Sequence, residues 1–145
     1  MAVTAKLYGR VFNSLGNKEI GWTADVLKVM LCTSTYVPDQ NAHQYKSSVT
    51  NEVVGTGYTA GGATLASVTA AYNGATKTQT ITCANPSWAA STLTARYAVF
   101  YDSTPATDAT RPLISYVDFG VDQVSSTGTF TIVIDSAGVA TFTVA

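Results

Sequence analysis

Apolar residues at the start of the chain recur at helical spacing, which predicts a short amphipathic helix. Their positions are Leu7, Tyr8, Val11, Phe12 and Leu15. Thr4 precedes this run as a candidate N-cap, and Gly16 follows it as a stop signal. Gly9 interrupts the run at a cost of about 1 kcal/mol relative to Ala. We therefore expect residues 1–20 to form a helical segment that is stabilised by packing on the rest of the chain.

From Asp25 onward the apolar period changes from helical to two, which is typical of strands. The stretch "DVLKVMLCT" alternates Leu27, Val29 and Leu31 with Val26, Lys28 and Met30. Both faces are mostly apolar, which predicts a central strand covered on both sides. A second alternating run, "STLTARYAVFYD", is expected to place five residues on one face: Leu93, Ala95, Tyr97, Val99 and Tyr101.

Turn signals divide the remaining strands. The "NGAT" at 73–76 separates two alternating runs and predicts a hairpin between 63–72 and 77–84. "LISYVDFG" reads as another strand, and the final 127–145 stretch reads as a hairpin that turns at "DSAG". The stretches 33–53, with one helical turn expected at Asp39, and 103–112 are predicted loops. These elements predict a single mainly β domain, 1–145, built as an antiparallel two-sheet, jelly-roll-like β-sandwich.

Four glycines within eight positions, 55–62, raise the question of a phosphate-binding loop. A P-loop needs a Lys after its last glycine, and here "GGATLAS" follows. A dinucleotide-binding loop needs a helix after it, and the sequence continues as a strand. We therefore interpret this stretch as a corner where the chain changes sheets, with positive φ at glycine and Tyr58 packed against it.

The composition changes the picture of the surface. Only 12% of the residues are charged, against a typical share of about 25%, and the net charge is −1. Such a surface suits extended strands, and burying it against another protein costs little free energy because few charges lose their water. The eight basic residues are scattered, which predicts no nucleic-acid binding. No stretch is long and apolar enough for a signal peptide or a membrane span, so we expect no membrane association.

Candidate catalytic chemistry is sparse. His43 is the only histidine and lies in the long loop without positioned partners. Asp118 and Asp122 flank Gly120, and Asp135 opens a later turn. We interpret these acids as turn residues, with a calcium site as the alternative. The sequence therefore predicts no enzyme activity and no cofactor.

Four further side chains allow two interpretations each. Cys32 and Cys83 are expected to be buried free thiols, with a disulfide between neighbouring strands as the alternative. Trp22 and Trp88 are expected to anchor the core or an interface, with sugar stacking as the alternative. In addition, Arg96 in the middle of a strand implies a carboxylate partner, an exposed face or a subunit contact.

Four stretches together resemble a family of small virion structural proteins of tailed bacteriophages. They are "GWTADVLKVMLCTSTYVPDQNAH", "NEVVGTGYTAGGATLA", "WAASTLTARYAVFYD" and "YVDFGVD…SSTGTFTI", and they span about residues 5 to 134. Members of this family look like decoration or cement proteins of the head. The resemblance implies a protein made in the bacterial cytoplasm and placed on the outer capsid surface. It also implies the major capsid protein and further copies of the chain, as a homotrimer, as partners.

This expectation leads to a set of candidate interface residues on the N-terminal segment and the long loops, together with Arg96 in the middle of a strand. They are Lys6, Tyr8, Arg10, Phe12, Tyr36, His43, Tyr45, Arg96 and Arg111. The alternative function is a tail- or fibre-associated virion protein that contacts host glycans through Trp88 and Tyr101. A third hypothesis, a small carbohydrate-active enzyme or lectin, needs paired acids or a metal that the sequence does not offer.

Overall fold

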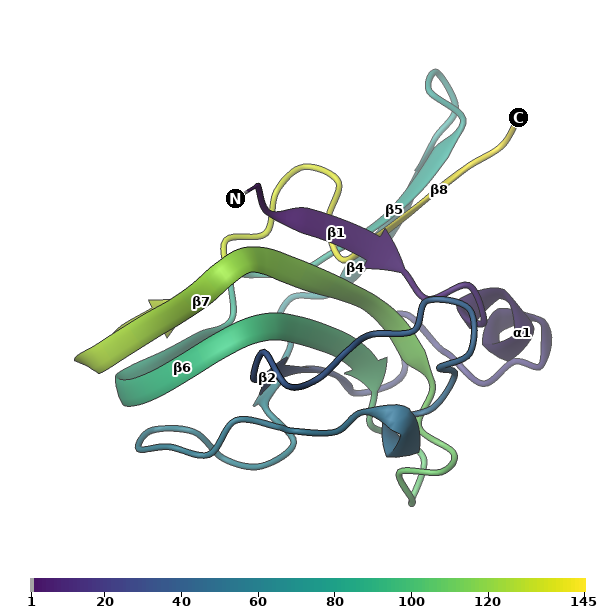
Figure 1. The fold of residues 1–145 in the computed structure, drawn as a ribbon. Coiled ribbons are helices and arrows are strands. Elements are labelled where there is room, and N and C mark those ends of the chain that lie inside the picture. The colour runs from purple at the N-terminus through teal and green to yellow at the C-terminus, as the bar shows by residue number, and fades with distance from the viewer. Residues whose placement is uncertain (1) are drawn as a thin grey trace.

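A computed structural model describes residues 2–145, which form two antiparallel sheets (Figure 1). The elements are β1 (Thr4–Leu7), α1 (Val11–Gly16), β2 (Leu27–Cys32), the 3₁₀ turn η1 (Lys46–Ser48), β3 (Ala63–Thr64), β4 (Thr69–Asn73), β5 (Thr78–Thr82), β6 (Ser87–Asp102), β7 (Leu113–Thr131) and β8 (Ala140–Thr143). The large sheet has the order β1-β7-β6-β2-β3, and the small sheet has the order β4-β5-β8. The predicted mainly β, two-sheet architecture is confirmed.

The large sheet is built on β6 and β7, which are long and strongly curved (Figure 1). Their pairing register shifts at several places, including the step from Ala95 to Tyr97. Such bulges bend a strand and reverse the direction of the side chains that follow. As a result Ala95 faces the main core, whereas Tyr97 and Tyr101 face the opposite side. The predicted single face from Leu93 to Tyr101 is therefore wrong beyond the bulge.

Two apolar clusters occupy the two faces of the large sheet. The main core lies between the sheets and contains residues of β2, β5, β6, β7 and β8. A second, tyrosine-rich cluster lies on the other face. In β2, Leu27, Val29 and Leu31 belong to the main core, and Met30 and Cys32 belong to the second cluster. The prediction that this strand is covered on both sides is confirmed.

The N-terminal segment differs from the predicted helix. Thr4–Leu7 forms β1, which pairs with β7 from Asp118 to Ser115, so Thr4 is not an N-cap. The helix covers only Val11–Gly16, and its N-cap position is Arg10. The free edge of β7 satisfies the backbone of β1, and Gly9 weakens any longer helix at this place. Tertiary pairing therefore overrides the helical spacing of the apolar residues.

The hairpins are confirmed in one case and corrected in the other. β4 and β5 pair around the "NGAT" turn as predicted, but the expected strand 63–72 is split. Its first part, β3, pairs with β2, and the chain then crosses to the small sheet. The expected C-terminal hairpin is wrong, because β8 pairs with β5 and the stretch 127–131 continues β7.

The glycine-rich stretch forms a turn, as expected. Gly62 has φ of +80°, and a Cβ at this position would lie 1.9 Å from the carbonyl oxygen of Val29. The hydroxyl of Tyr58 donates to Glu52 at 2.7 Å and accepts from the amide of Leu31 at 3.0 Å, which fixes the turn against β2. The change of sheet comes later than predicted, after β3 rather than at the glycines.

Candidate interaction surfaces

The structure divides the nine predicted interface residues into three groups. Lys6, Arg10 and Phe12 are exposed; His43, Tyr45, Arg96 and Arg111 are half-buried; Tyr8 and Tyr36 are buried. The two tyrosines have exposed fractions of 0% and 1%, so neither is available for contact with a partner in this conformation. Their assignment to an interface is wrong, because amphipathic tyrosine rings are also the residues that fill a polar core cluster.

Tyr8 and Tyr36 hold the long loop on the large sheet. Their hydroxyls hydrogen-bond at 2.8 Å, and the Tyr36 hydroxyl also lies 3.1 Å from Nδ1 of His43. Burial raises the pKa of Tyr8 well above its ordinary value and raises the pKa of Tyr36 to about 12. Both phenols are therefore neutral hydrogen-bonding groups. The expected turn at Asp39 is present, because the amide of His43 donates to the carbonyl oxygen of Asp39 at 3.1 Å.

The second half of the loop 33–53 also forms hydrogen bonds and ion pairs with other parts of the same chain. Tyr45 donates to Glu19 at 3.2 Å, and Lys46 forms an ion pair with Asp108 at 2.9 Å. Arg111 pairs with the same carboxylate at 2.8 Å. These two cations lower the pKa of Asp108, with Lys46 as the larger cause. The loops 33–53 and 103–112 are thus held together by these contacts, and they cover the second cluster.

Arg96 has the carboxylate partner that the sequence implied. Its Nε lies 2.6 Å from Oδ1 of Asp118, across the β6–β7 pair. The Arg96 hydrogen bond is the main cause that lowers the pKa of Asp118, and the amide of Gly120 adds a second hydrogen bond. Asp118 therefore stabilises a bulge and its arginine, which explains the "VDFG" stretch without a bound cation.

A partly exposed aromatic group lies where α1 meets the small sheet. Phe12 is 58% exposed, and its ring centroid lies 5.8 Å from that of Phe142 in β8. Trp22 lies 5.9 Å from the same Phe142 ring. We call Phe12, Trp22 and Phe142 the aromatic cluster. The sequence pattern identified Phe12, but it did not show that Phe142, 130 residues later, lies beside it.

Three other sequence hypotheses are decided by burial. Trp88 is a core residue beside Phe130 and Tyr58, and Tyr101 is buried in the second cluster. Neither ring is displayed for stacking on a sugar. Cys32 and Cys83 are both free thiols, as expected, although Cys83 is only half-buried.

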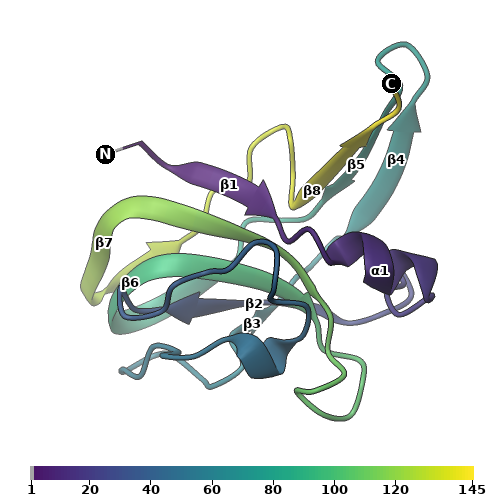
Figure 2. The same ribbon diagram turned by 45° about the vertical axis from the view of Figure 1, so that its right-hand side comes forward.

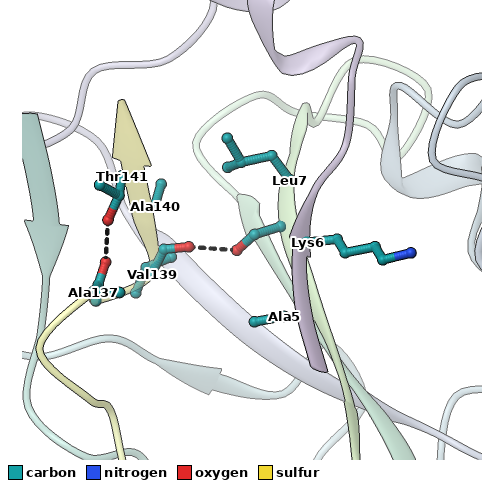
Figure 3. Close-up of a pocket in the computed structure, with 9 residues that line it drawn as sticks. Ala5, Lys6, Leu7, Ala137, Val139, Ala140 and Thr141 are labelled. Carbon is teal, nitrogen blue, oxygen red and sulfur yellow. Dashed lines mark hydrogen bonds between the residues drawn. The ribbon is translucent and has the colours of Figure 1, made fainter. Parts of the chain in front are cut away.

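A cleft of about 190 Å³ separates β1 from β8, the facing edges of the two sheets (Figure 3). Two hydrogen bonds shape its wall: Ser115 Oγ donates to the carbonyl oxygen of Val139 at 2.7 Å, and Thr141 donates to that of Ala137 at 2.5 Å. Lys6 is the one charged residue of the lining, and Figure 3 shows its side chain pointing away from β8. The cleft offers small apolar and hydroxyl groups and no convergent acids.

A broader hollow of about 490 Å³ lies between the end of α1 and the loop 103–112, lined by Lys18, Glu19, Tyr45, Pro105, Ala109 and Thr110. Within residues 2–145, no three His, Cys, Asp or Glu side chains gather closely enough to hold a metal ion. No helix in this part of the chain is long and apolar enough to cross a membrane.

The small sheet projects from the body as an arm (Figures 1 and 2). The strand registers place eight small, uncharged residues on one of its faces: Thr69, Ala71, Asn73, Thr78, Thr80, Thr82, Thr141 and Thr143. A contact of 3.3 Å between the hydroxyls of Thr78 and Thr143 confirms their common side. We call this surface the threonine face. The opposite face carries Ile81 and Ala140 into the main core.

The threonine face was not identified from the sequence, although a signal for it was present. "TQTIT" and "TFT" repeat Thr at every second position, and alternate residues of a strand share a face. The pattern did not show that β8 pairs with β5, which brings the two threonine rows together.

No known protein family, curated protein or solved structure matches this chain.

Proposed function

We propose that this chain is a structural protein of a tailed-bacteriophage virion that decorates the outer surface of the head. In this role it binds the major capsid protein and stabilises the contacts between capsid subunits. It associates with further copies of itself as a homotrimer, is made in the bacterial cytoplasm, and carries no catalytic activity. The sandwich is then a jelly-roll-like scaffold whose purpose is to present surfaces.

The threonine face is the observation that carries this proposal. It is a regular, uncharged surface on an arm that stands away from the body (Figure 2). Burying hydroxyls and methyl groups against a partner removes no charge from water, so little desolvation opposes docking. Several contacts of this kind, repeated over a shell, add to a strong attachment although each is weak.

The charged side chains support the same interpretation. Arg96, Arg111 and Lys46 are each paired with an acid of their own chain, so these three cations are not free to steer a partner. The N-terminal candidates Lys6, Arg10 and Phe12 stay available at the surface. We therefore assign the capsid contact to two uncharged elements, the aromatic cluster and the threonine face.

The proposal is tested by adding the purified chain to capsids that lack decoration and measuring bound copies per head by sedimentation. We expect saturable binding at a stoichiometry set by the lattice symmetry. The dissociation constant should change less than about threefold between 50 and 500 mM salt, because few charges take part. Phe12→Ser should weaken binding about tenfold or more, whereas Val54→Ser, at an even more exposed apolar position outside the helix, should not.

A tail or fibre position is the alternative, and the same experiment separates the two. Binding to tails or to host cells, with no addition to heads, would replace the decoration function by the alternative. The glycan contact first expected at Trp88 and Tyr101 would then have to use other residues, since both are buried.

A further inference from the structure

The outer edge of the arm is open. β4 forms one edge of the small sheet, pairs only with β5 among residues 2–145, and is exposed along its whole length. Tyr72, the fourth of its five residues, is 57% exposed. An edge strand presents a row of unpaired N–H and C=O groups, which is a template for pairing with another strand.

The other sheet edges are protected and this one is not. β3 is only two residues long, β1 carries Lys6, and β8 lies opposite β1 across the cleft (Figure 3). β4 reads "TAAYN", without a charge or a proline, and its register with β5 is continuous. Natural proteins protect an exposed edge with charge, proline, a bulge or short length. The absence of all these devices indicates an edge that is covered when the protein acts.

We propose that β4 pairs antiparallel with β4 of a second copy across a two-fold axis, with Ala71 opposite Ala71 of the other copy. This register places Thr69 opposite Asn73 and Ala70 opposite Tyr72. The large ring then lies beside a small side chain, and no two bulky groups meet. The two three-stranded arms then form one continuous six-stranded sheet whose threonine faces are on the same side. We call this contact between the two β4 strands the β4 joint.

The charge distribution permits this self-pairing. A two-fold axis brings identical residues together, so any charge at the centre of the strand would repel its own copy. Residues 63–84 contain a single charge, Lys77, and residues 136–145 contain none. Lys77 lies in the turn beyond the end of β4, and the antiparallel arrangement places the two copies of it at opposite ends of the joint.

The pairing deepens the proposed function and, in this respect, rests on it. Trimers on a shell are related to one another by two-fold axes, and arms that project from each trimer are suited to reach across them. The β4 joint would link neighbouring trimers, while the aromatic cluster attaches each chain to the capsid.

A charge exchange at residue 71 tests the pairing in solution. We expect the mass of the wild-type particle, measured by sedimentation equilibrium from about 10 µM to about 1 mM, to rise with concentration. Ala71→Lys and Ala71→Glu should each hold the mass at its low-concentration value, because two like charges face each other. An equimolar mixture of the two variants should associate again. Ala75→Lys, in the exposed turn beside the strand, is the matched charge control and should behave as the wild type.

Each outcome decides the proposal. A wild type of constant mass, an effect of Ala75→Lys equal to that of Ala71→Lys, or a mixture that fails to associate would overturn it. Head binding in the earlier experiment together with constant mass would retain the decoration function and remove the β4 joint. Association without head binding would retain the joint and remove the decoration function.

Discussion

Asp102 offers the sharpest test of how burial controls a charge in this fold. Its side chain lies at the end of β6 and is fully buried, and its Oδ2 has no hydrogen-bond partner among residues 2–145, although the carboxyl group of Asp25 lies nearby. The amide of Thr104 donates to Oδ1 at 2.9 Å. Burial, with the Asp25 carboxyl beside it, raises the pKa of Asp102 from 3.8 to about 6. Asp102 therefore keeps its proton in the folded protein at mildly acidic pH.

The sign and size of the effect follow from linkage. Because the folded pKa is raised, the stabilisation is fully present below the unfolded pKa near 4 and is lost as the pH rises through about 6. A pKa difference of about two corresponds to about 3 kcal/mol between pH 4 and pH 7. Asp102→Asn keeps the shape, carries no charge and can donate to Asp25. We therefore expect this variant to be about 3 kcal/mol more stable than the wild type at pH 7 and nearly equal to it at pH 4.

Urea unfolding at several pH values between 4 and 8 measures this difference directly. In thermal unfolding it corresponds to a rise in Tm of roughly 6–12 °C at pH 7, since a domain near this size shifts by about 2–4 °C per kcal/mol. Asp108 and Asp118 have lowered pKa values, so their contribution to the free energy of unfolding is lost in acid, which is the opposite pH dependence. This contribution is the same in the variant and the wild type and cancels when the two are compared. A difference in stability that does not depend on pH would refute the raised pKa of Asp102.

Three further predictions concern the turn, the tyrosine pair and the thiols. Gly62→Ala should destabilise the fold by more than about 3 kcal/mol or prevent folding, because its Cβ would overlap the carbonyl of Val29; circular dichroism and chemical unfolding measure this. Tyr36→Phe should cost about 1–3 kcal/mol in the same assay, because it leaves the buried hydroxyl of Tyr8 without its partner. In thiol labelling of the native protein at pH 8, Cys83 should react faster than Cys32, since burial raises the pKa of Cys32 to about 12.

Matched variants control these experiments. Gly16→Ala has open space around the new methyl group and should leave stability unchanged or raise it slightly. Tyr72→Phe changes an exposed ring and should shift stability by less than about 0.5 kcal/mol. Labelling of the Cys83→Ser variant should lack the fast reaction, which assigns that reaction to the Cys83 thiol. Equal losses in a variant and its control would contradict the contact invoked, and rapid labelling of Cys32 in the folded protein would contradict its burial.

Local patterns predicted the elements whose signals are local. The hairpin at "NGAT", the two-sided burial of β2 and the turn at the glycines depend on neighbouring residues, and each is confirmed. A carboxylate partner for Arg96 was one of the implied options, and Asp118 provides it. These features need only alternation, turn chemistry and the cost of an unpaired charge in a strand.

The features that were missed depend on partners far away in the sequence. Thr4–Leu7 has a helical pattern but finds the open edge of β7, and Ala140–Thr143 resembles half of a hairpin but finds β5 instead. The bulge after Ala95 reverses a face in the middle of β6 without any Gly or Pro in that strand to mark it, since Gly120, the glycine at this bulge, lies in β7. The interface residues Tyr8 and Tyr36 failed for the same reason, because only the folded loop brings their hydroxyls together.

The pairing of β1 with β7 has a consequence for biosynthesis. β1 leaves the ribosome well before its partner residues, Ser115 to Asp118, which are made more than a hundred residues later. Contacts of such long sequence separation make folding slow, because a large loop must close before they form. The nascent β1 therefore stays unpaired until those residues are made. The polar Thr4 and the charged Lys6 oppose aggregation of β1 while it is unpaired.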